Sequence, residues 1–234
     1  MAGVVIIGAG QAAAQTAASL RQEKFEGPIT LFGEEPEFPY QRPPLSKDYL
    51  AGKISVEKTL VRPQEFYDSK NIAVHLNTKV KEIDPEKNTI STESAETHEY
   101  DNLVIATGSR ARELKIPGSE LNGIHYLRSL RDVDSIRTEM RTAKEICIVG
   151  GGYIGLEVAA VASVLGLKVT VLEMESRILK RVTTPEMSEF YHALHTKKGV
   201  NIVCGAQVKR FEGKSTVSSI VTEETTFKSD LVIV

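Results

Sequence analysis

Apolar residues gather in short runs that are each followed by a helical stretch, and this order occurs twice along the chain. In the first half, VVII at residues 4–7 precedes an alanine-rich stretch to about Arg21, and ITLF follows at 29–32. In the second half, ICIV at 146–149 precedes a helical stretch and then VTVL at 169–172. Short apolar runs that alternate with helices predict buried parallel strands joined by helical crossovers. We therefore expect an α/β protein with two units of the same kind.

The turn after the first apolar run carries small residues at fixed spacing. Gly8, Gly10 and Ala13 lie between the expected strand and the expected helix. Such residues permit a tight turn and let backbone N–H groups approach a pyrophosphate at the helix N-terminus, where the helix dipole favours negative charge. Alanine in place of a third glycine is acceptable, because that position serves packing of the helix on the strand. The next strand ends at Glu34 and Glu35, whose carboxylates can accept hydrogen bonds from ribose hydroxyls.

The second half repeats this arrangement with a full set of glycines. Gly150, Gly152 and Gly155 follow the apolar run, and Glu173 closes the next strand. One such fingerprint is a weak indication of a nucleotide site. Two of them, each with a strand before, a helix after and a terminal acid, predict two dinucleotide sites.

The internal repeat extends beyond the two glycine fingerprints, and aligning its copies shows that the first one contains an insertion. Val80 aligns with Val208 and Leu103 with Leu231, both at a separation of 128 positions, whereas the two glycine turns lie 142 positions apart. The first copy therefore carries about eleven extra residues between Glu34 and Val80. The phrase PYQRPPLSK, residues 39–47, lies within that excess.

This insertion follows a strand end, which is where open parallel sheets bind their ligands. Its prolines stiffen it, and we expect a short helix from Ser46 to Ala51 that ends at Gly52. The functional interpretation is a rigid, cation-bearing lip over a dinucleotide site, and the alternative is a solvated loop.

Composition excludes several classes of protein. The chain has 234 residues, 41% of them hydrophobic and 26% charged, with a net charge of −2. The charge gives no global reason to expect nucleic acid or a membrane surface as partner. The N-terminus shows neither a signal peptide nor a membrane span, so the expected compartment is the cytoplasm.

The cysteines and histidines do not predict a redox centre or a metal site. Cys147 and Cys204 lie far apart in apolar runs and are expected to be buried small hydrophobes, so a dithiol redox centre is not predicted. His192 and His195 could share a helix face, but no third ligand accompanies them, and no metal site is predicted.

Five stretches together resemble a known family, the FAD-dependent NADH:ferredoxin reductases that supply bacterial oxygenases and cytochromes P450. They are GAGQAAAQTAASLR, PYQRPPLSK, LVIATGSRAR, IVGGGYIGLEVAA and VTVLE with RILKRV. The match covers the whole chain, and its most specific element is the combination of PPLSK with LEVAA. The resemblance implies two Rossmann-like dinucleotide-binding domains of glutathione-reductase-like architecture: an FAD-binding part over residues 1–108 and an NAD-binding part over 109–234.

The resemblance also assigns residues to FAD. The turn would hold the pyrophosphate, Glu34 the adenosine ribose, and Val80 the adenine edge through its backbone, with Arg42 and Lys47 on the flavin side. The full set is Gly8, Gly10, Gln11, Ala12, Ala13, Glu34, Arg42, Lys47, Val80, Ala106, Thr107, Gly108 and Arg128.

NADH would bind to the second copy. Glu157 would lie beside the nicotinamide, Glu173 on the ribose, and Arg177 and Arg181 near the adenosine end. The set is Gly150, Gly152, Tyr153, Ile154, Gly155, Glu157, Glu173 and Arg181.

Chemistry in this family belongs mostly to the cofactors, while the protein supplies position and electrostatics. A hydride passes from nicotinamide to flavin, and electrons then pass singly to a 2Fe–2S ferredoxin, so no side chain has to be a nucleophile. The residues expected at the reacting groups are Lys47 and Glu157, which should meet as an ion pair.

One departure from the family concerns length. Val234 corresponds by the repeat to Ala106, whereas family members continue for well over a hundred residues through a second FAD segment and an interface domain. The family activity could therefore be absent from this polypeptide, which is then expected to hold FAD weakly. The alternative function is a nucleotide-binding or regulatory module, or an apoptosis-inducing-factor-like flavoprotein.

Overall fold

The computed structural model describes residues 3–234. The chain forms two compact units. The first comprises the residues up to Arg42 together with Val56–Arg110, and the second comprises Pro43–Ser55 together with Ala111–Val234. The insertion predicted from the repeat is thus divided at the Arg42–Pro43 bond, with PYQR in the first unit and PPLSK in the second.

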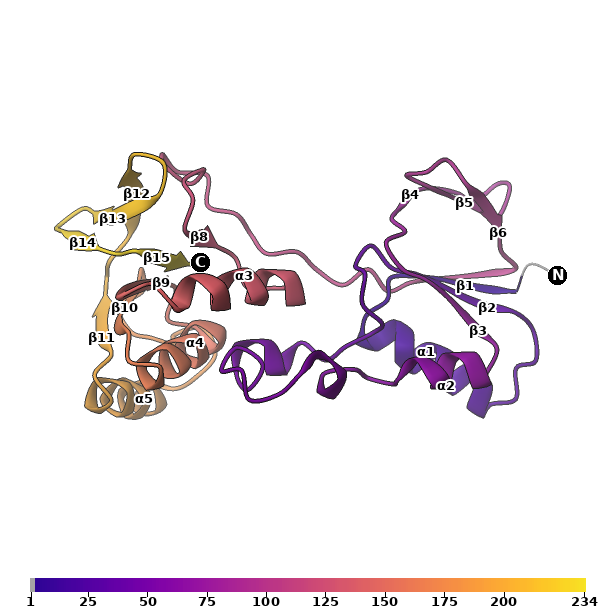
Figure 1. The fold of residues 1–234 in the computed structure, drawn as a ribbon, viewed down its shortest axis with the longest axis horizontal. Helices are drawn as coiled ribbons and strands as arrows, with labels where there is room; N and C mark the ends of the chain where they lie inside the picture. The colour runs from indigo at the N-terminus through magenta and orange to yellow at the C-terminus, as the bar shows by residue number, and fades with distance from the viewer. Residues whose placement is uncertain (1–2) are drawn as a thin grey trace. The chain divides into compact units, whose positions relative to one another are not determined.

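The first unit contains a four-stranded parallel sheet of order β3-β2-β1-β7. Figure 1 shows α1 and α2 on one side of this sheet and the antiparallel strands β4, β5 and β6 on the other. The elements are β1 Val4–Ile7, α1 Gln11–Gln22, β2 Ile29–Phe32, the 3₁₀ turn η2 Val56–Lys58, α2 Gln64–Ser69, β3 Ile72–His75, β4 Val80–Asp84, β5 Thr89–Thr92, β6 Thr97–Glu99 and β7 Asn102–Ile105.

Both faces of this sheet are buried, which explains why VVII is apolar throughout. Alternate residues of a strand point to opposite faces. The first and third residues of β1 pack with Ala13 and Ala17 of α1, and the second and fourth pack with Ile90 of β5 and with Tyr100. A continuous apolar run is therefore required here, in contrast to the alternating pattern of a half-exposed strand.

The second unit repeats this plan. Its parallel sheet has the order β11-β10-β9-β15-β8, with α4 and α5 on one side and the antiparallel sheet β12-β13-β14 on the other (Figure 1). The elements are η1 Pro43–Ser46, β8 Ile124–His125, α3 Leu130–Met140, β9 Glu145–Val149, α4 Tyr153–Val164, β10 Lys168–Glu173, α5 Pro185–Lys197, β11 Asn201–Cys204, β12 Val208–Gly213, β13 Val217–Thr222, β14 Thr226–Lys228 and β15 Leu231–Ile233.

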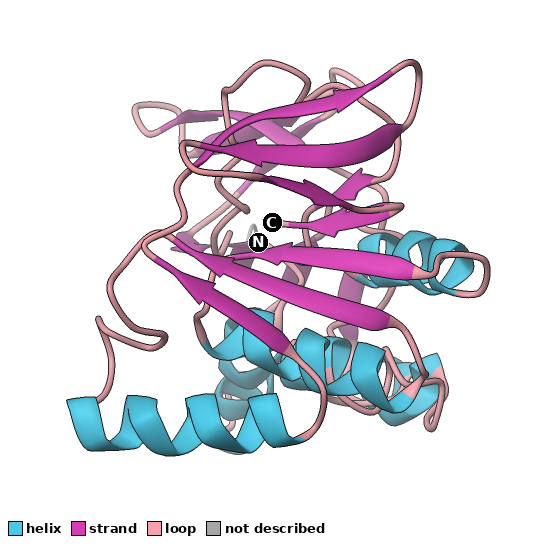
Figure 2. Ribbon diagram, turned by 90° about the vertical axis from the view of Figure 1, so that its left-hand side faces the viewer, coloured by secondary structure: helices cyan, strands magenta, loops and turns pink. Residues whose placement is uncertain are grey.

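The internal repeat read from the sequence is confirmed at the level of strands. Val80 and Val208 each begin the first strand of a three-stranded antiparallel sheet. Leu103 and Leu231 each lie on a strand, β7 or β15, that pairs in parallel with the first strand of its βαβ unit. The parallel strands are twisted relative to one another (Figure 2), as in other open parallel sheets. The predicted α/β class is therefore confirmed.

The short helix expected from Ser46 to Ala51 is wrong in position and type. The structure has a 3₁₀ turn over Pro43–Ser46, followed by hydrogen-bonded turns that end near Gly52, whose φ is +71°. Proline fixes φ near the helical value and lacks only an N–H that the first turn of a helix leaves unused, so two prolines start the turn earlier than Ser46 would.

Within residues 3–234, no helix is both long enough and apolar enough to cross a membrane.

Candidate functional site

The first glycine turn packs directly against the loop that follows β7. Gly8 has a φ of +112°, and a β-carbon added to it would lie 2.2 Å from the carbonyl oxygen of Ala106. The N–H of Ala106 in turn donates to the carbonyl of Ile7 at 2.8 Å. Only glycine fits at position 8, and the expected site residues Ala106, Thr107 and Gly108 begin beside it.

The N-terminus of α1 is open. Gly10 is the N-cap residue, no side chain among residues 3–234 caps the helix there, and a β-carbon on Gly10 would meet no atom within 4 Å. Gln11 and Ala12 are exposed, whereas Ala13 is buried against the sheet. The first N–H groups of a helix lack partners within the helix and suit a phosphate oxygen. The turn therefore fits a pyrophosphate.

The second turn has the same construction at α4. Gly150 has a φ of +118°, and Gly152 is an N-cap that no side chain in the described chain satisfies and whose surroundings are open. Gly155 is different, because an added β-carbon would lie 2.1 Å from the carbonyl oxygen of Gly150. Tyr153 and Ile154 are exposed in the first turn of α4. This turn also fits a dinucleotide.

The acid at the end of β10 supports the second glycine turn. Glu173 accepts hydrogen bonds from the N–H of Gly151 at 2.7 Å and from the N–H of Glu175 at 2.8 Å, one on each carboxylate oxygen. A carboxylate has about four acceptor sites, so both oxygens can still accept from ribose hydroxyls. Glu173 thus holds the turn and faces the space in front of it.

The two acids that follow β2 have different environments. Glu34 is half exposed, with Arg110 at 3.4 Å. Glu35 accepts from the hydroxyl of Tyr40 at 2.5 Å and from the guanidinium of Arg42 at 2.6 Å, and that guanidinium also lies over the Tyr40 ring. The carboxylate of Glu35 is therefore engaged with the PYQR segment, and Glu34 is the acid available to a ribose.

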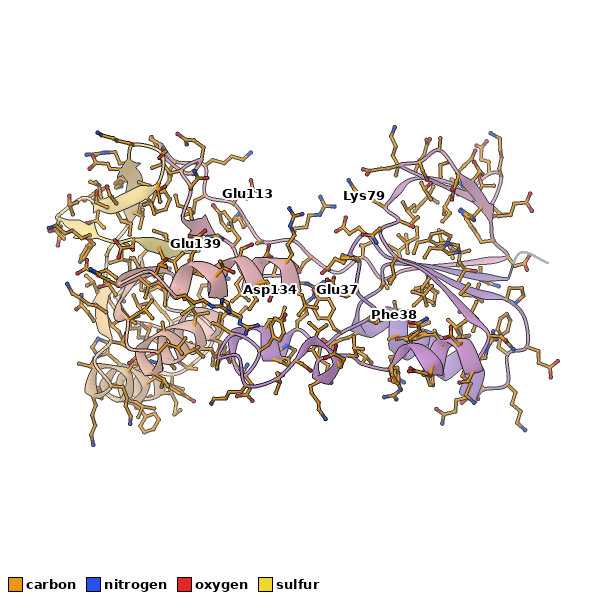
Figure 3. The ribbon with its side chains drawn as sticks, in the orientation of Figure 1. Glu37, Phe38, Lys79, Glu113, Asp134 and Glu139 are labelled. Atoms are coloured by element: carbon orange, nitrogen blue, oxygen red, sulfur yellow. The ribbon has the colours of Figure 1, made fainter. Side chains whose placement is uncertain are left out.

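A polar cavity of about 290 Å³ adjoins Glu34. It is lined by Glu34, Asn77, Thr78, Lys79, Thr92, Glu93 and Ser94. Lys79, labelled in Figure 3, pairs with Glu93 at 2.5 Å and directly precedes Val80, the first residue of β4. The cavity therefore brings hydrogen-bonding groups together with Glu34 and with Lys79, the neighbour of Val80.

The expected contact between the PPLSK segment and α4 is confirmed. The ammonium of Lys47 lies 2.8 Å from Oε1 of Glu157, and both residues belong to the second unit. The side chains are 48% and 30% exposed, so the pair is only partly desolvated. Ser46, which the sequence indicated only as the start of a short helix, donates its hydroxyl to Oε2 of Glu157 at 2.5 Å.

A second contact attaches the same segment to α3. Tyr49 donates its hydroxyl to Asp134 at 2.8 Å, and the guanidinium of Arg137 lies over the Tyr49 ring, 5.3 Å from its centre. Figure 3 labels Asp134 on α3. Leu45 and Leu50 are fully buried in the same segment. The segment is thus packed in place and is not the solvated loop that the sequence left as an alternative.

The cations near Glu173 are not equivalent. The guanidinium of Arg177 donates to the carbonyl oxygens of residues 180, 183 and 184 and to the hydroxyl of the buried Ser188. Arg181 is exposed. Arg177 therefore stabilises the loop to which it belongs, whereas the exposed side chain of Arg181 can contact a ligand.

Cysteine and metal chemistry are not supported by the site. Burial raises the pKa of the Cys147 thiol, so this side chain resists forming a thiolate. Cys204 is free and partly buried, and burial likewise raises its pKa. No cluster of metal-ligating side chains occurs in the described part of the chain.

Comparison with known proteins identifies the family. The model for pyridine nucleotide-disulphide oxidoreductases matches residues 2–234. The chain belongs to this family.

Relatives within the family include the reductases expected from the sequence. A ferredoxin–NAD(P)(+) reductase of Sphingomonas is 42% identical over 199 residues, which are 85% of this chain and 48% of that protein. Putidaredoxin reductase of Pseudomonas putida is 39% identical over 237 residues, covering 98% of this chain and 56% of that protein. The chain thus spans about half the length of these relatives.

Solved structures of ferredoxin reductases have the same fold as this chain. A covalent putidaredoxin reductase–putidaredoxin complex matches with a TM-score of 0.95 and 39% identity, over 99% of this chain and 57% of that one. A ferredoxin reductase of Rhodopseudomonas palustris matches with a TM-score of 0.96 and 36% identity, over 100% and 58%. The resemblance to this branch of the oxidoreductase family is confirmed.

Sequence reasoning missed the roles of several residues that build the site. Ser46 was expected only to begin a helix, Glu35 was considered only for the ribose, and Asp134 was not considered. Ser46 and Asp134 are common residue types whose partners lie far away in the sequence, so no local pattern distinguished their roles. Arg128, expected at FAD, lies just before α3 in the second unit, where its N–H donates to Asp132 at 3.0 Å.

Proposed function

We propose that this protein carries electrons from NADH through FAD to a 2Fe–2S ferredoxin, which supplies an oxygenase or cytochrome P450 in the cytoplasm. Residues 1–108 would form the FAD-binding part and 109–234 the NAD-binding part. The observation that carries the proposal is the pair of helix N-termini at Gly10 and Gly152 that no side chain among residues 3–234 caps. Glu173 is hydrogen-bonded to the second turn, and Glu34 follows shortly after β2 in the first unit.

FAD is assigned to the first glycine turn. The backbone from Gly8 to Ala13 would bind the pyrophosphate, and Glu34 the adenosine ribose. The cavity beside Glu34 supports this assignment, because its polar lining includes both that acid and Lys79, the neighbour of Val80, whose backbone would meet the adenine edge. The remaining proposed contacts are Arg42, Lys47, Ala106, Thr107, Gly108 and Arg128.

NADH is assigned to the second glycine turn. The N–H groups at the start of α4, around Tyr153 and Ile154, would bind the pyrophosphate, and Glu173 the adenosine ribose. Arg181, exposed beyond β10, would lie at the adenosine end. A carboxylate at the ribose favours a free 2′-hydroxyl over a 2′-phosphate.

The bound cofactors supply the hydride donor and the flavin that accepts it. The protein contributes charge and position. The Lys47 ammonium would favour negative charge developing on the flavin, and the carboxylate of Glu157 keeps that ammonium in one place. Neither residue needs to form a covalent bond.

The cysteines distinguish this proposal from disulfide reduction, which the family name also covers. Reduction of a disulfide through the enzyme requires at least one reactive, accessible thiolate. The chain has only two cysteines, and Cys147 is fully buried. One-electron transfer to a ferredoxin needs no thiol.

The test is NADH-driven reduction of a 2Fe–2S ferredoxin by the flavin-loaded protein, followed by the visible absorbance of the iron–sulfur cluster. We expect reduction to require all three components. A protein that reduces its flavin with NADH but never reduces a ferredoxin would contradict the proposal.

Rubredoxin is a second candidate acceptor. A rubredoxin–NAD(+) reductase of Pseudomonas putida is 37% identical over 233 residues, covering 99% of this chain and 60% of that protein. Presenting ferredoxin and rubredoxin in the same assay separates the two acceptors. The third possibility, a nucleotide-binding module or apoptosis-inducing-factor-like flavoprotein, predicts bound nucleotide with reduction of neither.

A further inference from the structure

Glu157 receives two donors from the same short segment. Lys47 approaches Oε1 at 2.8 Å, and the Ser46 hydroxyl donates to Oε2 at 2.5 Å. The two contacts differ in kind, because one is an ion pair and the other is a hydrogen bond from a neutral group. Together they fix both the position of the carboxylate and its rotation.

Ser46 is much less accessible than Lys47. It is 3% exposed, whereas the lysine side chain is 48% exposed. A charge-assisted hydrogen bond from a buried hydroxyl is among the stronger polar contacts in a protein. An exposed ion pair between flexible side chains is weak and screened by salt. The geometry of Glu157 therefore depends more on Ser46 than on Lys47.

The serine itself is held rigidly. It ends the 3₁₀ turn that begins at Pro43, and the N–H groups of Lys47 and Tyr49 both donate to the carbonyl of Pro44 at 3.0 Å. Tyr49 then anchors the segment to Asp134 on α3. A hydroxyl carried on such a turn needs little additional ordering to hold its partner.

We propose that Ser46 is a positioning residue that orients the carboxylate of Glu157 for NADH oxidation. The inference rests on the proposed function, since it assumes that Glu157 lies beside the nicotinamide. Ser46 carries no charge, so it acts by fixing Glu157, and through Glu157 the ammonium of Lys47. Misplacement of a group by about 1 Å can change a rate by up to about a hundredfold.

The kinetic test uses the flavin-loaded protein and two variants. Ser46→Ala removes the hydroxyl, and Ser46→Thr keeps it. Stopped-flow reduction by NADH should show a limiting rate roughly tenfold lower for Ser46→Ala, with an unchanged NADH dissociation constant and recovery in Ser46→Thr. Ser163→Ala is the matched control, because Ser163 also lies on α4 but donates to the carbonyl of Lys198 at 2.8 Å.

A second measurement reports the contact without any turnover. The thermal midpoints of wild type, Ser46→Ala, Glu157→Ala and the double variant form a double-mutant cycle. We expect a non-additive cycle, with the double variant closer to each single variant than the sum of their shifts. Additive shifts, or an unchanged limiting rate in Ser46→Ala, would overturn the proposal.

The two measurements separate this inference from the proposed function. If the wild-type flavin is not reduced by NADH, the proposed function fails, and a non-additive cycle then still supports the contact between Ser46 and Glu157. If reduction is normal in wild type and equally normal in Ser46→Ala, the positioning role fails while the proposed function stands.

Discussion

The ammonium of Lys47 lies 2.8 Å from the carboxylate of Glu157, although the two residues are 110 positions apart in the sequence. Lys47 comes from the insertion that distinguishes the first copy of the repeat, and Glu157 comes from the helix after the second glycine turn. The insertion thus brings a cation to the helix that follows the glycine turn of the other copy. Pro43 and Pro44 begin the 3₁₀ turn that directly precedes this lysine.

The first prediction concerns catalysis. In the flavin-loaded protein, Lys47→Ala and Glu157→Ala should each slow flavin reduction by NADH by roughly tenfold to a hundredfold, because the cation would stabilise charge building on the flavin. Lys47→Ala should change stability by less than about 1 kcal/mol, because the ion pair is partly exposed. Glu157→Ala should destabilise more, because it also leaves the buried Ser46 hydroxyl without its acceptor. Lys53→Ala is the control, since Lys53 lies in the same segment and pairs weakly with Asp48 at 3.7 Å. Unchanged reduction kinetics in both variants would exclude a catalytic role.

The second prediction separates folding from nucleotide binding within one turn. Gly8→Ala should destabilise the protein by about 2 kcal/mol or more, because the new β-carbon meets the Ala106 carbonyl and φ is +112°. Gly10→Ala should cost about 1 kcal/mol or less, since nothing lies within 4 Å, yet it should weaken FAD binding by occupying the space before α1. Urea unfolding and flavin titration measure the two effects. Equal destabilisation by both substitutions would contradict this division.

The third prediction concerns the choice of nucleotide. NADH should bind at least about tenfold more tightly than NADPH, because Glu173 repels a 2′-phosphate. Arg177 already donates to three backbone carbonyls and Ser188, so Arg181→Ala should be the change that lowers the remaining NADPH affinity. Calorimetric titration with both nucleotides tests this. Equal affinities in the wild-type protein would overturn the assignment.

The fourth prediction concerns a buried hydroxyl. Tyr67 is 0% exposed, and its hydroxyl has no hydrogen-bond partner within the described chain. Burying an unpaired hydroxyl costs free energy, so Tyr67→Phe should leave stability unchanged or raise it by about 1 kcal/mol. Tyr49→Phe is the matched comparison, because it removes the hydrogen bond to Asp134 and should destabilise. Urea unfolding should rank Tyr67→Phe above wild type and Tyr49→Phe below it; loss of stability in Tyr67→Phe would show that the hydroxyl has a partner.

The fifth prediction follows from the same two tyrosines. Burial raises the pKa of Tyr67 to about 12, and burial together with the hydrogen bond to Asp134 raises the pKa of Tyr49 to about 12. Both values exceed the ordinary value of 10.0, so the neutral phenols favour the folded state below pH 10, and this contribution is lost as pH rises toward 12. Each tyrosine should contribute a slope of up to about 1.4 kcal/mol per pH unit in that range. The free energy of unfolding, measured from pH 8 to 11.5, should decline less steeply with pH in Tyr67→Phe than in wild type. Identical slopes would contradict the raised pKa of Tyr67.

Local features of the chain were enough to predict the α/β class, the repeat and both glycine turns. The run VVII indicates a strand that is buried on both faces, and Gly8, with a φ of +112°, marks the sharp turn from strand into helix. Both patterns can be read from adjacent residues, although the residues that pack against them, such as Ala106, lie far along the chain. The contact of Lys47 with Glu157 was also predicted, from the resemblance to a family together with the place of Lys47 in the insertion and of Glu157 in the first turns of the second helix.

Only the tertiary structure decided which acid and which arginine have side chains free to contact a bound nucleotide. Glu34 and Glu35 are identical neighbours, but Tyr40 and Arg42 fold back onto Glu35. Arg177 and Arg181 look interchangeable, but the loop closes around Arg177 alone.

The sequence by itself therefore determined the strands, the turns and the residue types that a dinucleotide site requires, because those depend on backbone geometry and local spacing. Folding decided which side chains form hydrogen bonds with one another. It brought Ser46 to Glu157 across 111 positions and Tyr49 to Asp134 across 85 positions. Such pairings depend on how distant segments pack, and a serine or a tyrosine carries no local mark of the partner it will meet.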